Sequence, residues 1–161
     1  MNLVHAFGQT KEEKINDIRE KFQKINQDTV YIVKTLNNEQ FLDKMTDGGG
    51  SLIGYYKGEK IYKIIERVGV SYCVRTFEYY FWEDQLIFVY ESELDPLYNE
   101  SKASFDWGNV NIVFEGRYYF DKGKLIEIKV VGKKRIVDDQ EENKERILST
   151  DAKRNIALLK K

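Results

Sequence analysis

The chain has 161 residues, 42% of them hydrophobic and 33% charged, a composition typical of one folded domain and not of a disordered segment. Its 26 basic and 27 acidic residues leave a formal net charge of −1, which gives no long-range attraction to nucleic acid or to an anionic membrane. The single cysteine, Cys73, excludes an intrachain disulfide, and no apolar run approaches the roughly 20 residues of a membrane span.

The N-terminus carries a pattern typical of the end of a signal peptide. In "LVHAFGQT" the small residues Ala6 and Gly8 lie two apart, as they do at a signal-peptidase cleavage site. We interpret residues 1–9 as a signal-peptide remnant or a flexible N-terminus, and residues 10–161 as a single α+β domain. The remnant predicts a periplasmic or secreted protein, and the alternative is a cytoplasmic one.

The first predicted element is a helix. Thr10 and Glu13 form a T-x-x-E capping box, in which each side chain accepts a hydrogen bond from the other residue's backbone. The residues that follow at helical spacing form one apolar stripe, which we expect to pack on a sheet. The stripe comprises Ile15, Ile18, Phe22 and Ile25.

Three shorter segments follow. "DTVYIVKTL" (28–36) is rich in β-branched residues and predicts a strand. "NNEQFLDKM" (37–45) fits a short helix or a loop. "TDGGGS" (46–51) predicts a turn or a flexible hinge, since neither a lysine-serine pair nor a helical pattern follows it to form a phosphate loop.

Three related phrases then predict three β-hairpins of an antiparallel meander. They are "IGYYKGEKIYKI", "FEYYFWEDQLIFVY" and "GRYYFDKGKLIEIKV", each with a Tyr-Tyr pair, a polar turn and an aliphatic residue. The spacing from the first tyrosine to the aliphatic residue predicts that the first turn is one residue shorter than the others. Gly58 and Gly123 suit the left-handed positions of tight turns, and Asp84 is the best substitute in the middle phrase.

Alternation along the strands predicts which side chains share a face of the sheet. The apolar face of the middle hairpin would carry Phe77, Tyr79, Phe81, Leu86, Phe88 and Tyr90. The opposite, mixed face would carry Thr76, Glu78, Tyr80, Ile87, Val89 and Glu91. In the last hairpin, a three-residue loop would place Arg117 opposite Glu127, whereas a four-residue loop would reverse the facing of the second strand.

The remaining chain reads as a connection and a helical end. Residues 91–111 contain the only proline, Pro96, and predict a long connection. From Asp138 onward the pattern is helical, and the segment Ser149–Asp151 is expected to end one helix and begin another. Four residues of this region fall on one face: Leu148, Ala152, Ile156 and Leu159.

The ordered combination of these phrases resembles a family of uncharacterised exported bacterial proteins of the Bacteroidetes type. The stretch "DGGGSLIGYYKGEKIYKI", the two later Tyr-Tyr phrases and the helix "INDIREKFQKIN" (15–26) carry the resemblance, which covers roughly residues 11–130. The middle phrase departs from the family pattern, with Trp-Glu-Asp-Gln in place of a glycine-containing turn. The resemblance implies export and transfers no catalytic residues.

Several catalytic classes find little support. The only histidine, His5, lies in the segment 1–9, which disfavours a histidine-based triad or a histidine-ligated zinc site. Cys73 lies in a strand pattern, where a buried small side chain is the simplest interpretation. Four strand carboxylates remain as candidates for an acid–base pair, which in glycosidases lies roughly 5–9.5 Å apart. They are Glu78, Glu91, Glu93 and Glu115.

The sequence therefore predicts an α+β fold, an antiparallel β-meander of about six or more strands packed by an N-terminal helix and a C-terminal helix. We expect an exported, non-enzymatic binding or scaffold module of the bacterial cell envelope with no cofactor and no metal. Its expected partner is a protein or a small polar ligand, and not nucleic acid. Alternatives are an inhibitor or immunity-type protein and a hydrolase that uses strand carboxylates. The half-polar sheet face and the hairpin tip supply the candidate ligand- or partner-binding residues: Tyr80, Trp82, Tyr119 and Arg117.

Overall fold

The computed structural model describes residues 8–136 and 143–161, without the side chains of residues 107 and 108. The helices are α1 (Lys11–Gln27), α2 (Asn38–Phe41), a 3-10 turn η1 (Glu100–Lys102) and α3 (Lys144–Leu159). The strands are β1 (Ile32–Asn37), β2 (Gly50–Lys57), β3 (Lys60–Val70), β4 (Cys73–Trp82), β5 (Gln85–Asn99), β6 (Ser104–Asp121) and β7 (Lys124–Gly132). His5, most of the proposed signal-peptide remnant and residues 138–142 of the predicted C-terminal helix lie outside the described residues.

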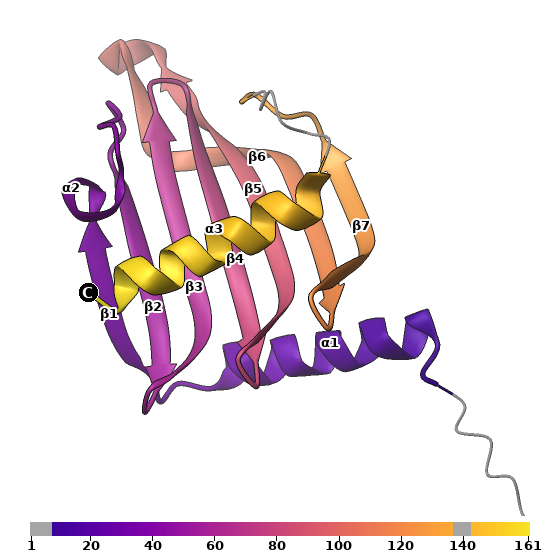
Figure 1. The fold of residues 1–161 in the computed structure, drawn as a ribbon. Coiled ribbons are helices and arrows are strands. Elements are labelled where there is room, and N and C mark those ends of the chain that lie inside the picture. Colours follow the sequence, from indigo (N-terminus) through magenta and orange to yellow (C-terminus); the bar gives the residue numbers. More distant parts are fainter. Residues whose placement is uncertain (1–7, 137–142) are drawn as a thin grey trace, which may run out of the picture.

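The strands form one antiparallel sheet of seven strands in chain order, so the predicted α+β meander is confirmed. Figure 1 shows α3 running diagonally across the front of the sheet and α1 lying behind the hairpin ends of the strands. The two helices therefore pack on opposite faces of the sheet. We call the two faces the α1 face and the α3 face, after the helix that packs on each. None of the described helices is long and apolar enough to cross a membrane.

Helix α1 begins where the capping box predicts. The Thr10 hydroxyl accepts a hydrogen bond from the Glu13 amide at 3.2 Å, and the Thr10 amide donates to the Glu13 carboxylate at 2.7 Å. This reciprocal pair satisfies two donors at the start of the helix. The predicted stripe faces the sheet and packs on a cluster of side chains from β4, β5 and β6. The cluster on the sheet comprises Tyr80, Ile87, Phe88 and Tyr119.

Helix α3 is continuous, so the predicted break at Ser149–Asp151 is wrong. Serine, threonine and aspartate favour helix starts, but here the buried side chains on either side of that segment anchor the helix to the sheet. Leu148, Ala152 and Leu159 are each at most 2% exposed. The predicted apolar face of this helix is therefore its packing face, with Ile156 half-buried beside it.

The three hairpins share one construction, which corrects the predicted difference in turn length. Each has a two-residue turn, followed by a bulge in the second strand. The pairing register shifts after Tyr55, Tyr80 and Tyr119. The next residue in each hairpin is aromatic and pairs across the turn with an aliphatic residue, in the pairs Tyr56–Ile61, Phe81–Leu86 and Phe120–Leu125. In the first hairpin the Tyr-Tyr pair lies one residue nearer the turn than in the other two hairpins. This offset, and not a shorter turn, explains why the first tyrosine and the aliphatic residue are closer together in the first phrase.

The turns use backbone that few side chains adopt. Gly58 and Gly123 have φ of 58° and 78°, as predicted for the left-handed positions. In the middle hairpin Glu83 and Asp84 take φ of 49° and 62°, so Asp84 substitutes for glycine as predicted and Glu83 joins it. Two adjacent residues of positive φ are typical of the type I′ turn, whose twist matches that of the flanking strands.

The bulges overturn the predicted faces of the second strands. In the middle hairpin Ile87 is unpaired, because Phe81 pairs with Leu86 while Tyr80 pairs with Phe88. One extra residue shifts alternation by one, so every later side chain of β5 changes face. Phe88 and Tyr90 therefore lie on the α1 face, and Val89 and Glu91 lie on the α3 face with Phe77 and Tyr79.

The same construction explains why Arg117 does not lie opposite Glu127. With a two-residue turn and a bulge, Tyr119 pairs with Glu127 and Arg117 pairs with Lys129. Glu127 instead forms an ion pair with Lys11 of α1, and Arg117 pairs with Glu115 of its own strand at 3.0 Å. Both predicted loop lengths were longer than the observed turn.

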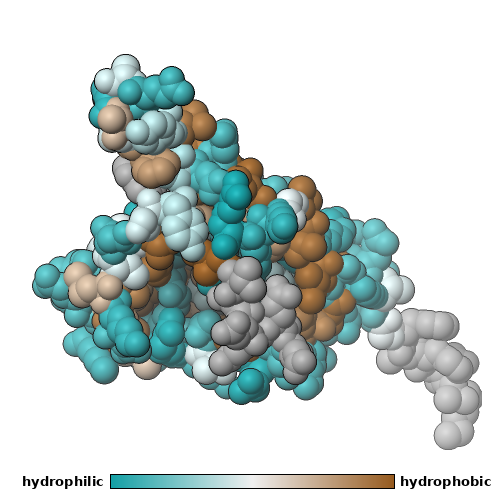
Figure 2. Space-filling view, turned by 90° about the horizontal axis from the view of Figure 1, so that it is seen from above, coloured by the Kyte–Doolittle hydropathy of each residue, from teal (hydrophilic) through white to brown (hydrophobic). Residues whose placement is uncertain are grey.

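Residues 91–111 are not a long connection but the outer half of a hairpin. Strands β5 and β6 continue through this segment to the turn η1 and form an arm, the faint salmon hairpin at the top of Figure 1. Pro96 is tolerated because the register shifts between it and Leu97, and a bulge relieves the need for its missing amide hydrogen. The molecule seen from above has a projecting lobe at this arm (Figure 2).

Candidate functional site

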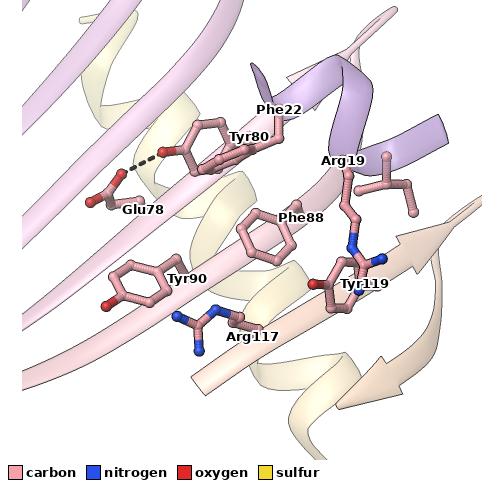
Figure 3. A pocket seen from close by; sticks show the side chains of 9 residues that line it. Arg19, Phe22, Glu78, Tyr80, Phe88, Tyr90, Arg117 and Tyr119 are labelled. Carbon is pink, nitrogen blue, oxygen red and sulfur yellow. Dashed lines mark hydrogen bonds between the residues drawn. The ribbon is translucent and has the colours of Figure 1, made fainter. Parts of the chain in front are cut away.

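The best candidate site is a hollow of about 360 Å³ on the α1 face, between α1 and strands β4, β5 and β6. Its volume lies within the range of roughly 300–1,000 Å³ that is typical of small-molecule pockets. Nine side chains line it, and Figure 3 shows them converging from the helix and the three strands. They are Ile18, Arg19, Phe22, Glu78, Tyr80, Phe88, Tyr90, Arg117 and Tyr119.

The floor of this α1 pocket is a grid of two cross-strand rows. The first row, Tyr80–Phe88–Tyr119, is aromatic and lies beside α1. The second row, Glu78–Tyr90–Arg117, lies farther from the hairpin turns and is polar. Antiparallel pairing places directly opposed side chains on one face about 5 Å apart, so each row is contiguous. The pocket thus has an apolar half and a polar half.

The aromatic row is held to α1 by ring contacts. Phe22 of α1 lies 4.8 Å from the Tyr80 ring and 5.3 Å from the Phe88 ring, both between centroids. Phe88 and Tyr119 are 5.0 Å apart. These tilted and edge-on arrangements are favourable for aromatic pairs. The position of the helix wall is therefore set by Phe22 and by its neighbour in the stripe, Ile18.

Glu78 is neutralised within the protein. Its carboxylate accepts a hydrogen bond from the Tyr80 hydroxyl at 2.5 Å, drawn in Figure 3, and forms an ion pair with Lys63 at 2.7 Å. Burial, followed by the charge of Glu78, raises the pKa of Tyr80 well above its ordinary value. The hydroxyl therefore keeps its proton at physiological pH and remains a donor.

Tyr90 and Arg117 share a second carboxylate, Glu115. The Tyr90 hydroxyl donates to Glu115 at 2.5 Å, and the Arg117 guanidinium donates to it at 3.0 Å. Burial raises the pKa of Tyr90 to about 12, with the hydrogen bond to Glu115 as the next cause. Arg117 also lies over the Tyr90 ring, 5.4 Å from its centroid, which fixes the guanidinium at the pocket wall.

Arg19 reaches the pocket from α1. Its guanidinium lies over the Tyr119 ring, 6.0 Å from the centroid, and donates to the Asn16 side chain at 3.1 Å. Figure 3 shows it above Tyr119. Among the described residues no carboxylate lies within ion-pair distance of Arg19, in contrast to Arg117. A guanidinium with most of its five donors unused faces the pocket.

Three of the four predicted site residues meet in this pocket, namely Tyr80, Arg117 and Tyr119. The fourth, Trp82, does not. It packs edge-on to Tyr62, with ring centroids 6.4 Å apart, and under Lys21 of α1, and it lines a separate hollow beside the hairpin turns. Tyr80 and Tyr119 are only 1% and 5% exposed, so they form the pocket floor.

Sequence reasoning missed Arg19, Phe22 and Tyr90 as site residues. Arg19 directly follows Ile18, so it lies at the border of the apolar stripe of α1. A cation at the edge of a packing stripe is the one signal that could have indicated it. Tyr90 was assigned to the other face because the bulge at Ile87 is not visible in the alternation.

The four candidate carboxylates do not form one site, because two lie on each face. Glu78 and Glu115 lie on the α1 face and are engaged as described. Glu91 and Glu93 are fully buried on the α3 face. Glu91 accepts from the Tyr118 hydroxyl at 2.7 Å, and Glu93 accepts from the backbone amides of Arg135 and Ile136. Glu93 thereby fixes the chain that leaves β7.

Cys73 is fully buried, as expected for a small side chain in a strand. Burial raises the pKa of its thiol, and the nearby carboxylate of Glu93 adds to the shift. A thiol with a raised pKa is a poor nucleophile at neutral pH.

No protein-family model, curated protein or solved structure matches the chain.

Proposed function

We propose that this protein is an exported, non-enzymatic binding module of the bacterial cell envelope, and that the α1 pocket takes a small molecule. One observation carries the proposal. The pocket combines an aromatic floor with a few convergent polar groups, the arrangement usual for small-molecule sites. Export, and a periplasmic or secreted location, follow from the N-terminal pattern and the family resemblance.

The polar groups of the pocket favour binding over hydrolysis. Glu78 and Glu115 each accept from a tyrosine hydroxyl and pair with a basic side chain. A general acid and base need free access to the reacting bond, which these contacts occupy. The same contacts hold the tyrosine rings in fixed positions, and such preorganisation favours affinity.

A neutral fluorescent probe tests the proposal. N-phenyl-1-naphthylamine brightens when it enters an apolar site, and we expect saturable 1:1 binding to the full chain. The Phe22→Ala variant removes the ring that joins α1 to the floor and should weaken binding about tenfold or more, the equivalent of losing roughly 1.4 kcal/mol. Tyr72→Ala, an aromatic that is 55% exposed, is the matched control and should bind as the wild type does.

The absence of saturable binding would contradict the proposal, and so would equal affinities for the wild type and Phe22→Ala. Circular dichroism of each variant shows whether it is folded. Export is tested separately, by expressing the full gene and sequencing the N-terminus of the secreted product. Retention of an intact N-terminus in the cytoplasm would refute that part.

A second candidate function, an inhibitor or immunity-type protein, is favoured by the arm of β5 and β6. Its side chains are unusually apolar for a projecting hairpin. Leu97, Tyr98, Phe105, Val110 and Ile112 are each 39–58% exposed. This function predicts one stoichiometric protein partner. The double substitution Tyr98→Ser and Phe105→Ser should abolish binding of that partner, whereas Phe22→Ala should leave it unchanged.

A further inference from the structure

The charges around the α1 pocket are not balanced. Two arginines and one glutamate line it, a net charge of +1. Glu78 is already paired with Lys63, outside the lining, and Arg117 is paired with Glu115. The positive charge of Arg19 is therefore the one that no carboxylate in the described part of the chain offsets.

The charged hydrogen-bonding groups that remain available in the pocket are donors. The Tyr80 and Tyr90 hydroxyls donate to carboxylates, which fills acceptor sites on Glu78 and Glu115. Arg19 and Arg117 each retain N–H groups beyond those used for Asn16 and Glu115. The pocket therefore offers a ligand charged guanidinium donors above aromatic rings, beside the phenol hydroxyl of Tyr119.

From this geometry we infer that the ligand of the α1 pocket is a small amphipathic anion, with a flat apolar body and one carboxylate or sulfonate group. The body would lie on the aromatic row Tyr80–Phe88–Tyr119, against Phe22. The anionic group would lie between Arg19 and Arg117, where planar guanidinium groups favour bidentate pairing. This inference rests on the proposed function and specifies its ligand class.

Two probes with the same ring system separate the two claims. 1-Anilinonaphthalene-8-sulfonate is the N-phenyl-1-naphthylamine body with a sulfonate added. We expect the sulfonate to bind the full chain about fivefold or more tightly than the neutral probe, since charge-assisted hydrogen bonds are the stronger class. Added salt should weaken the binding of the sulfonate and leave the neutral probe unchanged, because salt screens exposed charges.

Substitutions locate the anion site. Arg19→Gln should remove most of the preference for the sulfonate over the neutral probe. Arg19→Lys keeps the charge and should keep at least half of the preference. Arg146→Gln is the matched control, since Arg146 is an exposed arginine of α3, on the other side of the sheet, and should have no effect.

The outcomes are distinguishable. If the neutral probe binds and the sulfonate binds no tighter, the inferred ligand class is wrong and the proposed pocket stands. The same conclusion follows if Arg19→Gln and Arg146→Gln behave alike. If neither probe binds in a saturable way, both the pocket and its ligand class are refuted.

Discussion

The replacement Phe22→Ala tests whether α1 is docked on the sheet as the pocket requires. Phe22 is half-buried, and its ring contacts the Tyr80 and Phe88 rings at 4.8 and 5.3 Å. Half of a buried phenylalanine side chain is worth about 1–1.5 kcal/mol. Two favourable ring pairs add about 0.5–1.5 kcal/mol each. We therefore expect the free energy of unfolding to fall by about 3 kcal/mol.

Urea denaturation followed by circular dichroism measures this loss, and a matched series apportions it. Phe22→Leu keeps most of the apolar burial and loses the ring pairs, so it should cost about 1–2 kcal/mol. The exposed Tyr72→Ala should cost less than about 0.5 kcal/mol. A loss below about 1 kcal/mol for Phe22→Ala would refute the docked position of α1, and with it the wall of the pocket.

Three further predictions concern the cap of α1, a hairpin turn and the packing of α3 on the sheet. Thr10→Ala removes half of the capping box and should lower stability by about 1 kcal/mol in urea denaturation, whereas no change would mean that the cap is not formed. Gly123→Ala should lower the free energy of unfolding by about 1–2 kcal/mol through backbone strain alone, because φ is 78° there and an added Cβ would meet no atom within 4 Å. Gly8→Ala, where an added Cβ also meets nothing, is the control and should leave stability unchanged. Burial raises the pKa of Glu66 above 4.5, although Asn155 of α3 donates to it at 2.6 Å. The Glu66 carboxyl therefore holds its proton more tightly in the folded state than in the unfolded state, and the free energy of unfolding of the wild type should fall as pH rises from 4.5 through the folded-state pKa. Glu66→Gln should remove this pH dependence, and a variant that loses stability with rising pH as the wild type does would contradict the prediction.

Local signals in the sequence predicted much of the fold. The Thr10 capping box and the stripe through Ile18 identify α1 because both depend on residues within one or two turns of a helix. The Tyr-Tyr phrases identify the hairpins because their turn residues and alternation are also local. Meander order follows once successive hairpins pair with their neighbours, since sequential strands are usually adjacent.

The errors in assigning side chains to faces of the sheet have one physical origin, which is that a bulge leaves no mark in residue type. Ile87 is an ordinary strand residue, yet leaving it unpaired moves Tyr90 to the α1 face and Glu91 to the α3 face. The arm was missed for a related reason. Pro96 and the polar residues around it are typical of loops, and only the register shift beside Pro96 allows a strand there.

The candidate site was predicted in part. Tyr80 and Tyr119 were found because alternation along a strand places the two tyrosines of each pair on opposite faces. Both pairs lie in the first strand of their hairpin, and the bulges lie in the second strand, so the prediction was not disturbed. Arg19 was not found because its position over the Tyr119 ring depends on how α1 lies along the sheet, a long-range contact that the local sequence does not indicate. Trp82 was placed in the site because an aromatic side chain was expected at a hairpin tip, but it packs under Lys21 of α1 and against Tyr62.

Amide-resolved NMR of the full chain, titrated with 1-anilinonaphthalene-8-sulfonate, tests the central claim most directly. The claim is that the ligand site lies between α1 and the two cross-strand rows of β4, β5 and β6. We predict that the resonances that shift are those of residues 18–22 and of Glu78, Tyr80, Phe88, Arg117 and Tyr119. Shifts confined to the arm or to the α3 face, or no saturable shifts at all, would contradict the account.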